Sequence, residues 1–277
     1  MKKRFLAHLA MVSALAVCSA AQAGIIEDFQ FNEADGTLLG AAVNSANPGN
    51  GWLVHANTVE SAVLDGSFRI QKNSVAGQAA NSLNISDVSS GKIWLVAELA
   101  GWNYTATPSS TLERVRFGFL DNDDGSLVAG SSTITAEMNI DRLSVANGGG
   151  IQLSGEALGA NNQPVVADLP LALVRDTPFT MVLEVDHDAD VYSVYYKDDA
   201  APFMLLGSGV LGDRSPGVKR EARAVRFAFT GQFGDIGEFV DVSRIYVTTT
   251  NPIPEPSTVL LGLLGALATI ARRKRMP

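Results

Sequence analysis

Between Ser67 and Thr248 the chain repeatedly shows short runs in which apolar or β-branched residues alternate with polar residues. Such a period of two is typical of strands that bury one face. Clusters of Gly, Asn, Asp, Ser and Pro separate the runs, and no long stretch has the 3.6-residue period of a helix. The runs are Ser67–Gln71, Ile93–Leu99, Arg114–Leu120, Thr133–Ile140, Phe179–Val185, Val191–Lys197, Ala224–Thr230 and Phe239–Thr248. They predict an all-β fold, a two-sheet antiparallel β-sandwich or jelly roll.

Two of these runs are nearly the same sequence. Val115–Phe119 reads Val-Arg-Phe-Gly-Phe and Val225–Phe229 reads Val-Arg-Phe-Ala-Phe. Each places a small residue between large apolar ones, and we expect both to be central strands of the sandwich. No regular repeat accompanies this echo, so it is interpreted as convergence.

The N-terminal end has the pattern of a secretory signal peptide. Lys2–Arg4 is basic, Phe5–Val17 is apolar, and Ala21 and Ala23 form an A-x-A cleavage site. Cleavage is therefore expected between Ala23 and Gly24. Residues 1–23 are assigned to the signal peptide and residues 24–250 to the β-sandwich domain.

The C-terminal end has three parts. Residues 251–256 contain three prolines at alternate positions, which predicts an extended, polyproline-like segment. Residues 257–271 carry no charge, and as a helix they would span roughly 22 Å, less than the ~30 Å hydrocarbon core of a bilayer. Residues 272–277 begin with four basic side chains, which favours a cytoplasmic end. Together they predict a short transmembrane helix with a basic cytoplasmic tail.

This tail resembles a known signal. Pro254, Glu255 and Pro256, an apolar helix, and then Arg272, Arg273, Lys274 and Arg275 are similar to the PEP-CTERM sorting signal of Gram-negative bacteria. The resemblance implies recognition and processing by an exosortase, an integral-membrane thiol protease/transpeptidase. It also implies a transient stay in the inner membrane, followed by the cell surface or extracellular matrix. An ordinary C-terminal anchor after a Pro-rich linker is the alternative.

Charge and cysteine content exclude several classes of function. Without Glu255 and the seven basic residues of the two ends, the body has 28 acidic and 14 basic residues, a net charge of −14. Such a surface repels nucleic acid and anionic membranes and suits cations. The only cysteine, Cys18, lies in the leader, so the body has no disulfide, thiol nucleophile or thiolate metal site. Leu15–Cys18 resembles a lipobox, but Val17 stands where a small residue is needed.

A second resemblance concerns the body. Ile26–Phe29, followed by Ala34–Leu38, Asn44–Gly49 and Trp52, is similar to the opening of concanavalin A-like (laminin G-like) sandwich domains. Phe239–Val247 is similar to their final strand, which returns to pair near the first. The resemblance implies the same sandwich fold and suggests carbohydrate binding.

Two acidic loops could bind calcium. Asp121 and Asp123 follow a strand, with a glycine close behind, and supply the oxygen ligands that a hard cation prefers. Asp186, Asp188 and Asp190 lie between two predicted strands, where a continued strand would place them on one face. The alternatives are a solvated turn in the first loop and a hairpin turn that splays the carboxylates in the second.

The second loop also resembles a catalytic strand. Glu184-x-Asp186-x-Asp188 is similar to the Glu-x-Asp-x-Glu strand of laminarinase-type glycoside hydrolases, which pairs a nucleophile with an acid/base. Here Asp188 replaces the second Glu and the motif sits at a hairpin tip. We therefore assign no catalytic residues, and expect no enzyme.

Aromatic residues are the usual platform for sugars. Trp94 lies inside an apolar strand and is expected in the core, whereas Trp102 and Tyr104 lie at a strand end and are candidates for glycan contact. The basic residues of the stretch Lys219–Arg226 lie among acidic neighbours, which predicts a solvated, charge-balancing edge.

These features predict an exported, non-enzymatic surface or matrix protein that binds glycan or exopolysaccharide weakly, with calcium as a candidate bridging ion. A secreted hydrolase using Glu184 and Asp188 and a purely structural matrix protein are the alternatives.

Overall fold

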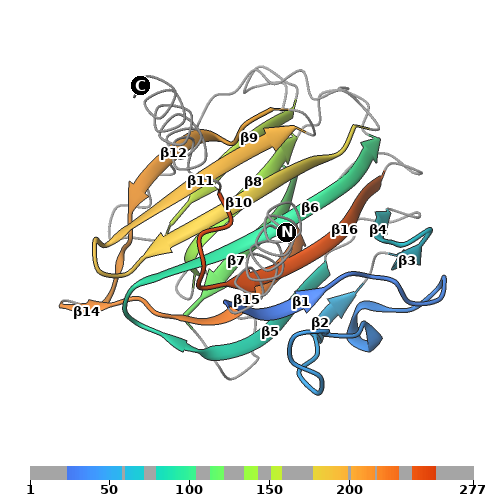
Figure 1. The fold of residues 1–277 in the computed structure, drawn as a ribbon, viewed down its shortest axis with the longest axis horizontal. Coiled ribbons are helices and arrows are strands. Elements are labelled where there is room, and N and C mark those ends of the chain that lie inside the picture. The colour runs from blue at the N-terminus through green and yellow to red at the C-terminus, as the bar shows by residue number, and fades with distance from the viewer. Residues whose placement is uncertain are drawn as a thin grey trace, which may run out of the picture.

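The computed structural model describes residues 24–57, 60–71, 79–103, 113–121, 134–142, 151–157, 177–198, 201–215, 217–230 and 239–253. In this part of the chain the fold is all-β, with two large antiparallel sheets packed face to face (Figure 1). Within these ranges no helix is long and apolar enough to cross a membrane. The predicted signal peptide, the Pro-Glu-Pro segment, the apolar helix and the basic tail lie outside the described residues, as do Asp123 and Tyr104.

The larger sheet has eight strands, in the order β12-β11-β10-β6-β16-β4-β3, with β1 also pairing with β16. Its strands are β1 (Ile25–Phe29), β3 (Glu60–Leu64), β4 (Ser67–Gln71), β6 (Lys92–Asn103), β10 (Phe179–Asp186), β11 (Val191–Asp198), β12 (Met204–Val210) and β16 (Phe239–Thr248). The last strand, β16, thus lies inside the sheet. It pairs with β6 on one side, and with β4 and β1 on the other.

The smaller sheet has six strands, in the order β2-β5-β15-β7-β8-β9. They are β2 (Leu53–Asn57), β5 (Ala79–Val88), β7 (Glu113–Leu120), β8 (Ile134–Arg142), β9 (Ile151–Glu156) and β15 (Ala222–Thr230). A short ribbon of β13 (Asp213–Ser215) and β14 (Val218–Lys219) and a single 3₁₀ turn, η1 (Leu39–Ala41), complete the described elements.

The two echoing sequences are neighbours in space. β7 and β15 pair antiparallel at the centre of the six-stranded sheet, with Val225 opposite Phe119 and Phe227 opposite Phe117. The rings of Phe117 and Phe227 stack with centroids 5.0 Å apart. Both segments are therefore central strands, as predicted.

The core fills the space between the two sheets. Its largest fully buried rings include Phe29 and Phe68 from the eight-stranded sheet and Phe117, Phe119 and Phe227 from the six-stranded sheet. Successive strand residues point to opposite faces, so the alternation in the sequence divides each strand into a core side and an outward side. The outward sides of the two sheets carry polar and aromatic groups.

Candidate functional site

The first and last strands of the body close the same sheet. β1 pairs with β16 from Ile25 opposite Thr248 to Phe29 opposite Ile245. One residue beyond this ladder, the Thr249 N–H donates a hydrogen bond of 2.8 Å to the Gly24 carbonyl oxygen. The structure therefore brings the residue after the predicted signal cleavage next to the chain segment that leads into Pro254. We call this contact the terminal junction.

Only glycine fits at the N-terminal side of the terminal junction. A Cβ atom on Gly24 would lie 2.0 Å from the Thr250 Oγ1, 2.8 Å from its Cβ and 2.9 Å from its backbone N. Two of these three atoms lie on or next to the backbone, so a larger residue would have to displace the chain after β16. The packing of residue 24 thus depends on the position of residue 250.

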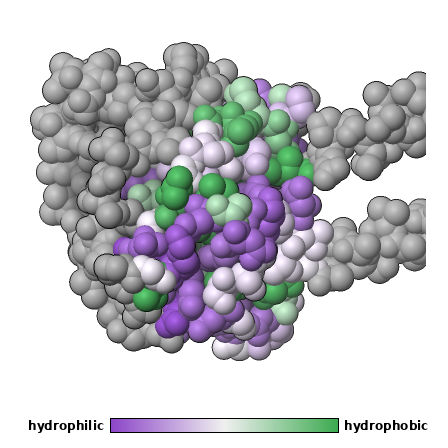
Figure 2. All heavy atoms as spheres, turned by 90° about the vertical axis from the view of Figure 1, so that its left-hand side faces the viewer, coloured by the Kyte–Doolittle hydropathy of each residue, from purple (hydrophilic) through white to green (hydrophobic). Residues whose placement is uncertain are grey.

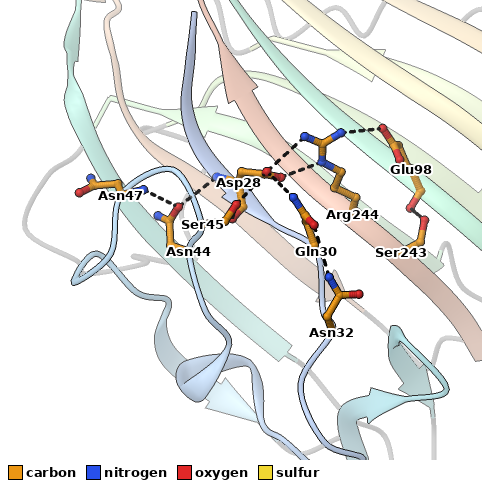
Figure 3. Close-up of polar contacts among 9 residues, drawn as sticks. All are labelled: Asp28, Gln30, Asn32, Asn44, Ser45, Asn47, Glu98, Ser243 and Arg244. Atoms are coloured by element: carbon orange, nitrogen blue, oxygen red, sulfur yellow. Dashed lines mark hydrogen bonds and ion pairs between the residues drawn. The ribbon is translucent and has the colours of Figure 1, made fainter. Parts of the chain in front are cut away.

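An ion pair fastens β1 to β16 on the outward face (Figure 3). The Arg244 Nε lies 2.7 Å from the Asp28 Oδ1, and Gln30 and Ser45 also donate hydrogen bonds to the Asp28 carboxylate. Burial alone would raise the pKa of Asp28, but the hydrogen bonds from Arg244, Gln30 and Ser45 outweigh it and lower the pKa below its ordinary value. The Arg244 guanidinium also lies 3.6 Å from the carboxylate of Glu98, which is on the neighbouring strand β6.

A loop of asparagines packs against the other side of β1. The buried Glu27 carboxylate accepts hydrogen bonds from the side-chain amides of Asn44, Asn47 and Asn50. In turn the Asn44 Oδ1 accepts hydrogen bonds from the backbone N–H groups of Asp28, at 3.1 Å, and Asn47, at 3.0 Å. The segment Asn44–Gly49, which resembles concanavalin A-like domains, thus holds the first strand in place.

Apolar side chains gather on the outward face of the eight-stranded sheet. Trp94 and Val96 of β6 and Val182 of β10 form a buried cluster. Four partly buried side chains pack against it: Tyr195, Phe203, Tyr246 and Ile253. We call six of these residues, all except Ile253, the outer patch: Trp94, Val96, Val182, Tyr195, Phe203 and Tyr246. Ile253 belongs to the segment after β16, which Figure 1 shows turning back across the eight-stranded sheet.

The six-stranded sheet carries a buried ionic network on its outward face. Glu137 of β8 is fully buried, and its carboxylate accepts hydrogen bonds of 2.8 Å from Arg116 on β7 and 3.1 Å from Arg226 on β15. Burial raises the pKa of Glu137, and the two guanidinium groups oppose that rise. A Cβ on Gly118 would lie 2.6 Å from the Glu137 Cβ, so the glycine of the first echoing sequence makes room for this carboxylate.

The network continues towards the β9 edge. Asp141 of β8 forms an ion pair of 2.9 Å with the Nε of Arg114, which also contacts Glu156 at 2.5 Å. The Ser154 hydroxyl donates a hydrogen bond of 2.5 Å to the Asp141 carboxylate. Burial raises the pKa of Asp141. We call these side chains the polar face: Arg114, Arg116, Glu137, Asn139, Asp141, Ser154, Glu156 and Arg226.

Sequence reasoning missed the polar face. The interpretation of Lys219–Arg226 as a solvated edge is wrong for Arg220, which is 7 % exposed, and for Arg226, which pairs with Glu137. The available signal was the period-two spacing of charged and polar residues in two strands, Arg114-x-Arg116 and Glu137-x-Asn139-x-Asp141. If the two strands are taken as neighbours, these two patterns place basic and acidic side chains on the same face of the sheet.

The second acidic loop is a hairpin turn. Residues 187–190 connect β10 and β11 at the end of the sandwich that faces the viewer in Figure 2, where hydrophilic residues gather. The Asp186 Oδ1 accepts hydrogen bonds from the backbone N–H groups of Asp188 and Ala189. Asp188 accepts one of 3.0 Å from the Gly91 N–H, and Asp190 pairs with Lys219.

This geometry bears on both hypotheses for the loop. The three carboxylates have separate partners, and within the described ranges no group of three or more His, Cys, Asp or Glu side chains could hold a metal ion. Glu184 is likewise occupied, by Lys92 at 2.6 Å and by the Tyr195 hydroxyl at 2.9 Å. Glu184 and Asp188 therefore do not form a free carboxylate pair, and the splayed hairpin turn is the alternative that the structure supports.

Other predicted residues are also placed. Asp121 is buried, with 6 % of its surface exposed, and the Arg223 Nε lies 3.5 Å from its carboxylate. Trp94 is buried, but it lies in the cluster on the outward face of the eight-stranded sheet and not in the core between the sheets, where it was expected. Trp102 was a candidate for glycan contact at an exposed strand end, but the residue is 4 % exposed and packs in the core between the sheets, so it does not form an exposed aromatic platform.

Comparison with known proteins agrees with both resemblances. The family of the PEP-CTERM protein-sorting motif matches residues 252–275, which implies export, envelope association and processing by an exosortase. Comparison with the sequences of curated proteins gives no match.

Solved structures show the same kind of sandwich. An endo-1,3-β-glucanase from Streptomyces sioyaensis matches with a TM-score of 0.52 and 13 % identity over 82 % of this chain and 96 % of its own. The binding domain of botulinum neurotoxin serotype D matches with a TM-score of 0.50 and 10 % identity, over 83 % of this chain and 49 % of its own. At such identities the likeness concerns the fold, a concanavalin A-like two-sheet sandwich.

Proposed function

We propose that this chain is an exported, non-enzymatic envelope or matrix protein whose sandwich body binds glycan after an exosortase has processed its tail. In this account, the signal peptide leaves before Gly24 and the apolar C-terminal segment holds the body at the inner membrane until processing. The body then resides at the cell surface or in the exopolysaccharide matrix.

The observation that carries the proposal is the position of the sorting motif relative to the fold. The matched segment begins at Pro252, four residues after the end of β16, the strand that is hydrogen-bonded to the first residues of the body. Both ends of the sandwich therefore leave it at one place. A domain built in this way can fold completely while its C-terminal segment is still in the membrane.

The carboxylates support a non-enzymatic body. Hydrolysis of a glycosidic bond by two carboxyl groups needs one that is free to attack or activate water and one that is protonated. Glu137 lies between two guanidinium groups, and Asp141 is held by Arg114 and Ser154. Burial raises the pKa of both carboxyl groups, and the neighbouring cations oppose that rise and occupy the carboxylate oxygens. Neither group is therefore free to attack a sugar or to activate water.

The choice of glycan follows from the shared fold. The Streptomyces protein of similar architecture is an endo-1,3-β-glucanase, so 1,3-β-glucan is the first probe, together with exopolysaccharide from the native host. Retention of the purified protein on either immobilised polysaccharide, without release of reducing sugar, is the expected result. Release of reducing sugar would favour the hydrolase alternative, and no retention would favour a purely structural matrix protein.

Sorting is tested separately from glycan binding. We expect a Glu255→Ala variant to stay in the membrane fraction of the native host at its unprocessed mass, while the wild type moves to the surface or medium. Asp87→Ala is a matched control, because Asp87 is an exposed acidic residue far from the tail in sequence. Equal distribution of Glu255→Ala and wild type would contradict the proposal.

A further inference from the structure

The segment between the last strand and the sorting motif does not leave the body freely. After the terminal junction, Thr250 and Asn251 are exposed, but Pro252 and Ile253 are partly buried again. Ile253 packs against the cluster of Trp94, Val96 and Val182 on the outward face of the eight-stranded sheet. The chain therefore returns to the body surface immediately before Pro254.

Local hydrogen bonds direct this return. The Thr249 N–H is fixed on Gly24, and the Thr250 N–H donates to the Thr248 Oγ1 at 3.0 Å. The Asn251 Oδ1 then accepts a hydrogen bond of 2.9 Å from the Ile253 N–H, which is a side-chain-stabilised turn. Three successive contacts thus turn the chain towards the outer patch rather than away from it.

The outer patch has the composition of a surface for Pro-rich segments. Its aromatic members, Trp94, Tyr195, Phe203 and Tyr246, are held by strands β6, β11 and β16 and by the chain just before β12. Polyproline-like segments dock on aromatic-lined surfaces at a low entropic cost, because their backbone is already extended. The segment that follows Ile253 is Pro254-Glu255-Pro256.

We propose that the outer patch is an intramolecular docking surface for the sorting linker, residues 251–256, which holds the Pro-Glu-Pro motif at a fixed place on the folded body for the processing enzyme. The proposal rests on the processing proposed above and adds to it the residues of the body that present the motif. A motif held in this way loses less freedom when the enzyme binds it, so docking speeds recognition.

Docking is tested by thiol protection in the full chain. The mature body has no cysteine, because Cys18 lies in the predicted leader. Two variants are compared: Ile253→Cys, and Thr249→Cys as an exposed reference. Each is expressed in the native host without its exosortase. The outer membrane is then permeabilised, and the cysteine is labelled with a membrane-impermeant maleimide. We expect Cys at 253 to react several-fold more slowly than Cys at 249. Equal rates would overturn the docking.

A substitution on the patch then tests its role. Phe203→Ser removes a partly buried ring of the outer patch, while Phe239→Ser removes a partly buried ring of the same sheet face that lies under Arg69, outside the patch. Phe203→Ser is expected to raise labelling at position 253 towards that at 249, and Phe239→Ser to leave it low. Equal labelling in both variants would contradict the assignment of the patch.

Processing is followed in the exosortase-containing host by pulse-chase. We expect tail removal to be several-fold slower in Phe203→Ser than in wild type and Phe239→Ser. If Phe203→Ser is processed at the wild-type rate or faster, the presenting role of the patch is wrong. If the wild type itself is never processed, the proposed function fails, whereas the labelling result still decides whether the linker docks.

Discussion

The carbonyl oxygen of Gly24 accepts a hydrogen bond of 2.8 Å from the N–H of Thr249. These residues are far apart in the sequence, yet one follows the predicted signal cleavage and the other precedes the sorting motif. Because β16 also pairs with β6 and β4, the eight-stranded sheet is complete only after the chain up to Thr248 is available. The ends of the body are thus part of the fold rather than appendages to it.

The terminal junction predicts a strong size limit at residue 24. Gly24→Ala would place a methyl group against Thr250, and overpacking of this kind costs about 1–3 kcal/mol in the free energy of unfolding. We expect a lower melting temperature and faster maleimide labelling of Cys at position 253. Gly51→Ala is the control, since a Cβ there meets nothing within 4 Å. Equal melting temperatures for the two variants would refute the size limit.

The Asp28–Arg244 pair predicts a dependence of stability on pH. The folded pKa of Asp28 is lowered, so its contribution is present above its unfolded pKa of about 3.9 and is lost as pH falls through the folded value. Asp28→Asn should therefore lower the urea midpoint at pH 7, and its difference from wild type should shrink below about pH 4. Asp87→Asn, at an exposed carboxylate, should change little at either pH. A difference for Asp28→Asn that is constant with pH would contradict the role of its charge.

The polar face predicts a large cost for removing one buried charge. Glu137→Gln leaves Arg116 and Arg226 without their shared counter-charge, and breaking a buried ion pair costs about 3–5 kcal/mol. Glu98→Gln is the matched control, because Glu98 is partly exposed and lies 3.6 Å from Arg244, where such pairs contribute about 0–1 kcal/mol. Chemical denaturation of both variants measures the difference. Similar costs would show that the charge of Glu137 is not needed.

The partners of the acidic residues predict no structural calcium in the hairpin turn. Asp186, Asp188 and Asp190 are held by backbone N–H groups, Lys92 and Lys219. We expect EDTA to leave the melting temperature unchanged, and Asp188→Asn to behave alike with and without added calcium. A fall in melting temperature on chelation that calcium restores, and that Asp188→Asn abolishes, would show that the turn binds the ion.

Much of the fold follows from the sequence because its signals are local. The alternation in each of the eight runs predicts a strand, and each run coincides with a strand of the structure, apart from Thr133, which lies outside the described residues. The likeness of Val115–Phe119 and Val225–Phe229 predicts two central strands, although not that they pair with each other. The apolar spacing says which side is buried but not which strand lies beside it.

The remaining features depend on contacts between distant strands. Arg226 pairs with Glu137 only because β15, β7 and β8 are neighbours, which a single run cannot reveal. Trp102 lies at the end of a run, as an exposed residue would, but β16 pairs beside it and its ring enters the core. In the same way, Ile253 lies in a Pro-rich stretch whose sequence predicts an extended linker, while its packing on Trp94 and Val182 appears only in three dimensions.

The central claim is that the body is released from both ends and that these ends meet at one place on the fold. Intact-mass measurement of the protein purified from its native host tests this most directly. The account predicts a chain that begins at Gly24 and lacks the basic tail, Arg272 to Pro277, with any added mass at the new C-terminus reporting what the exosortase attaches. A mature protein that still ends at Pro277 would contradict it.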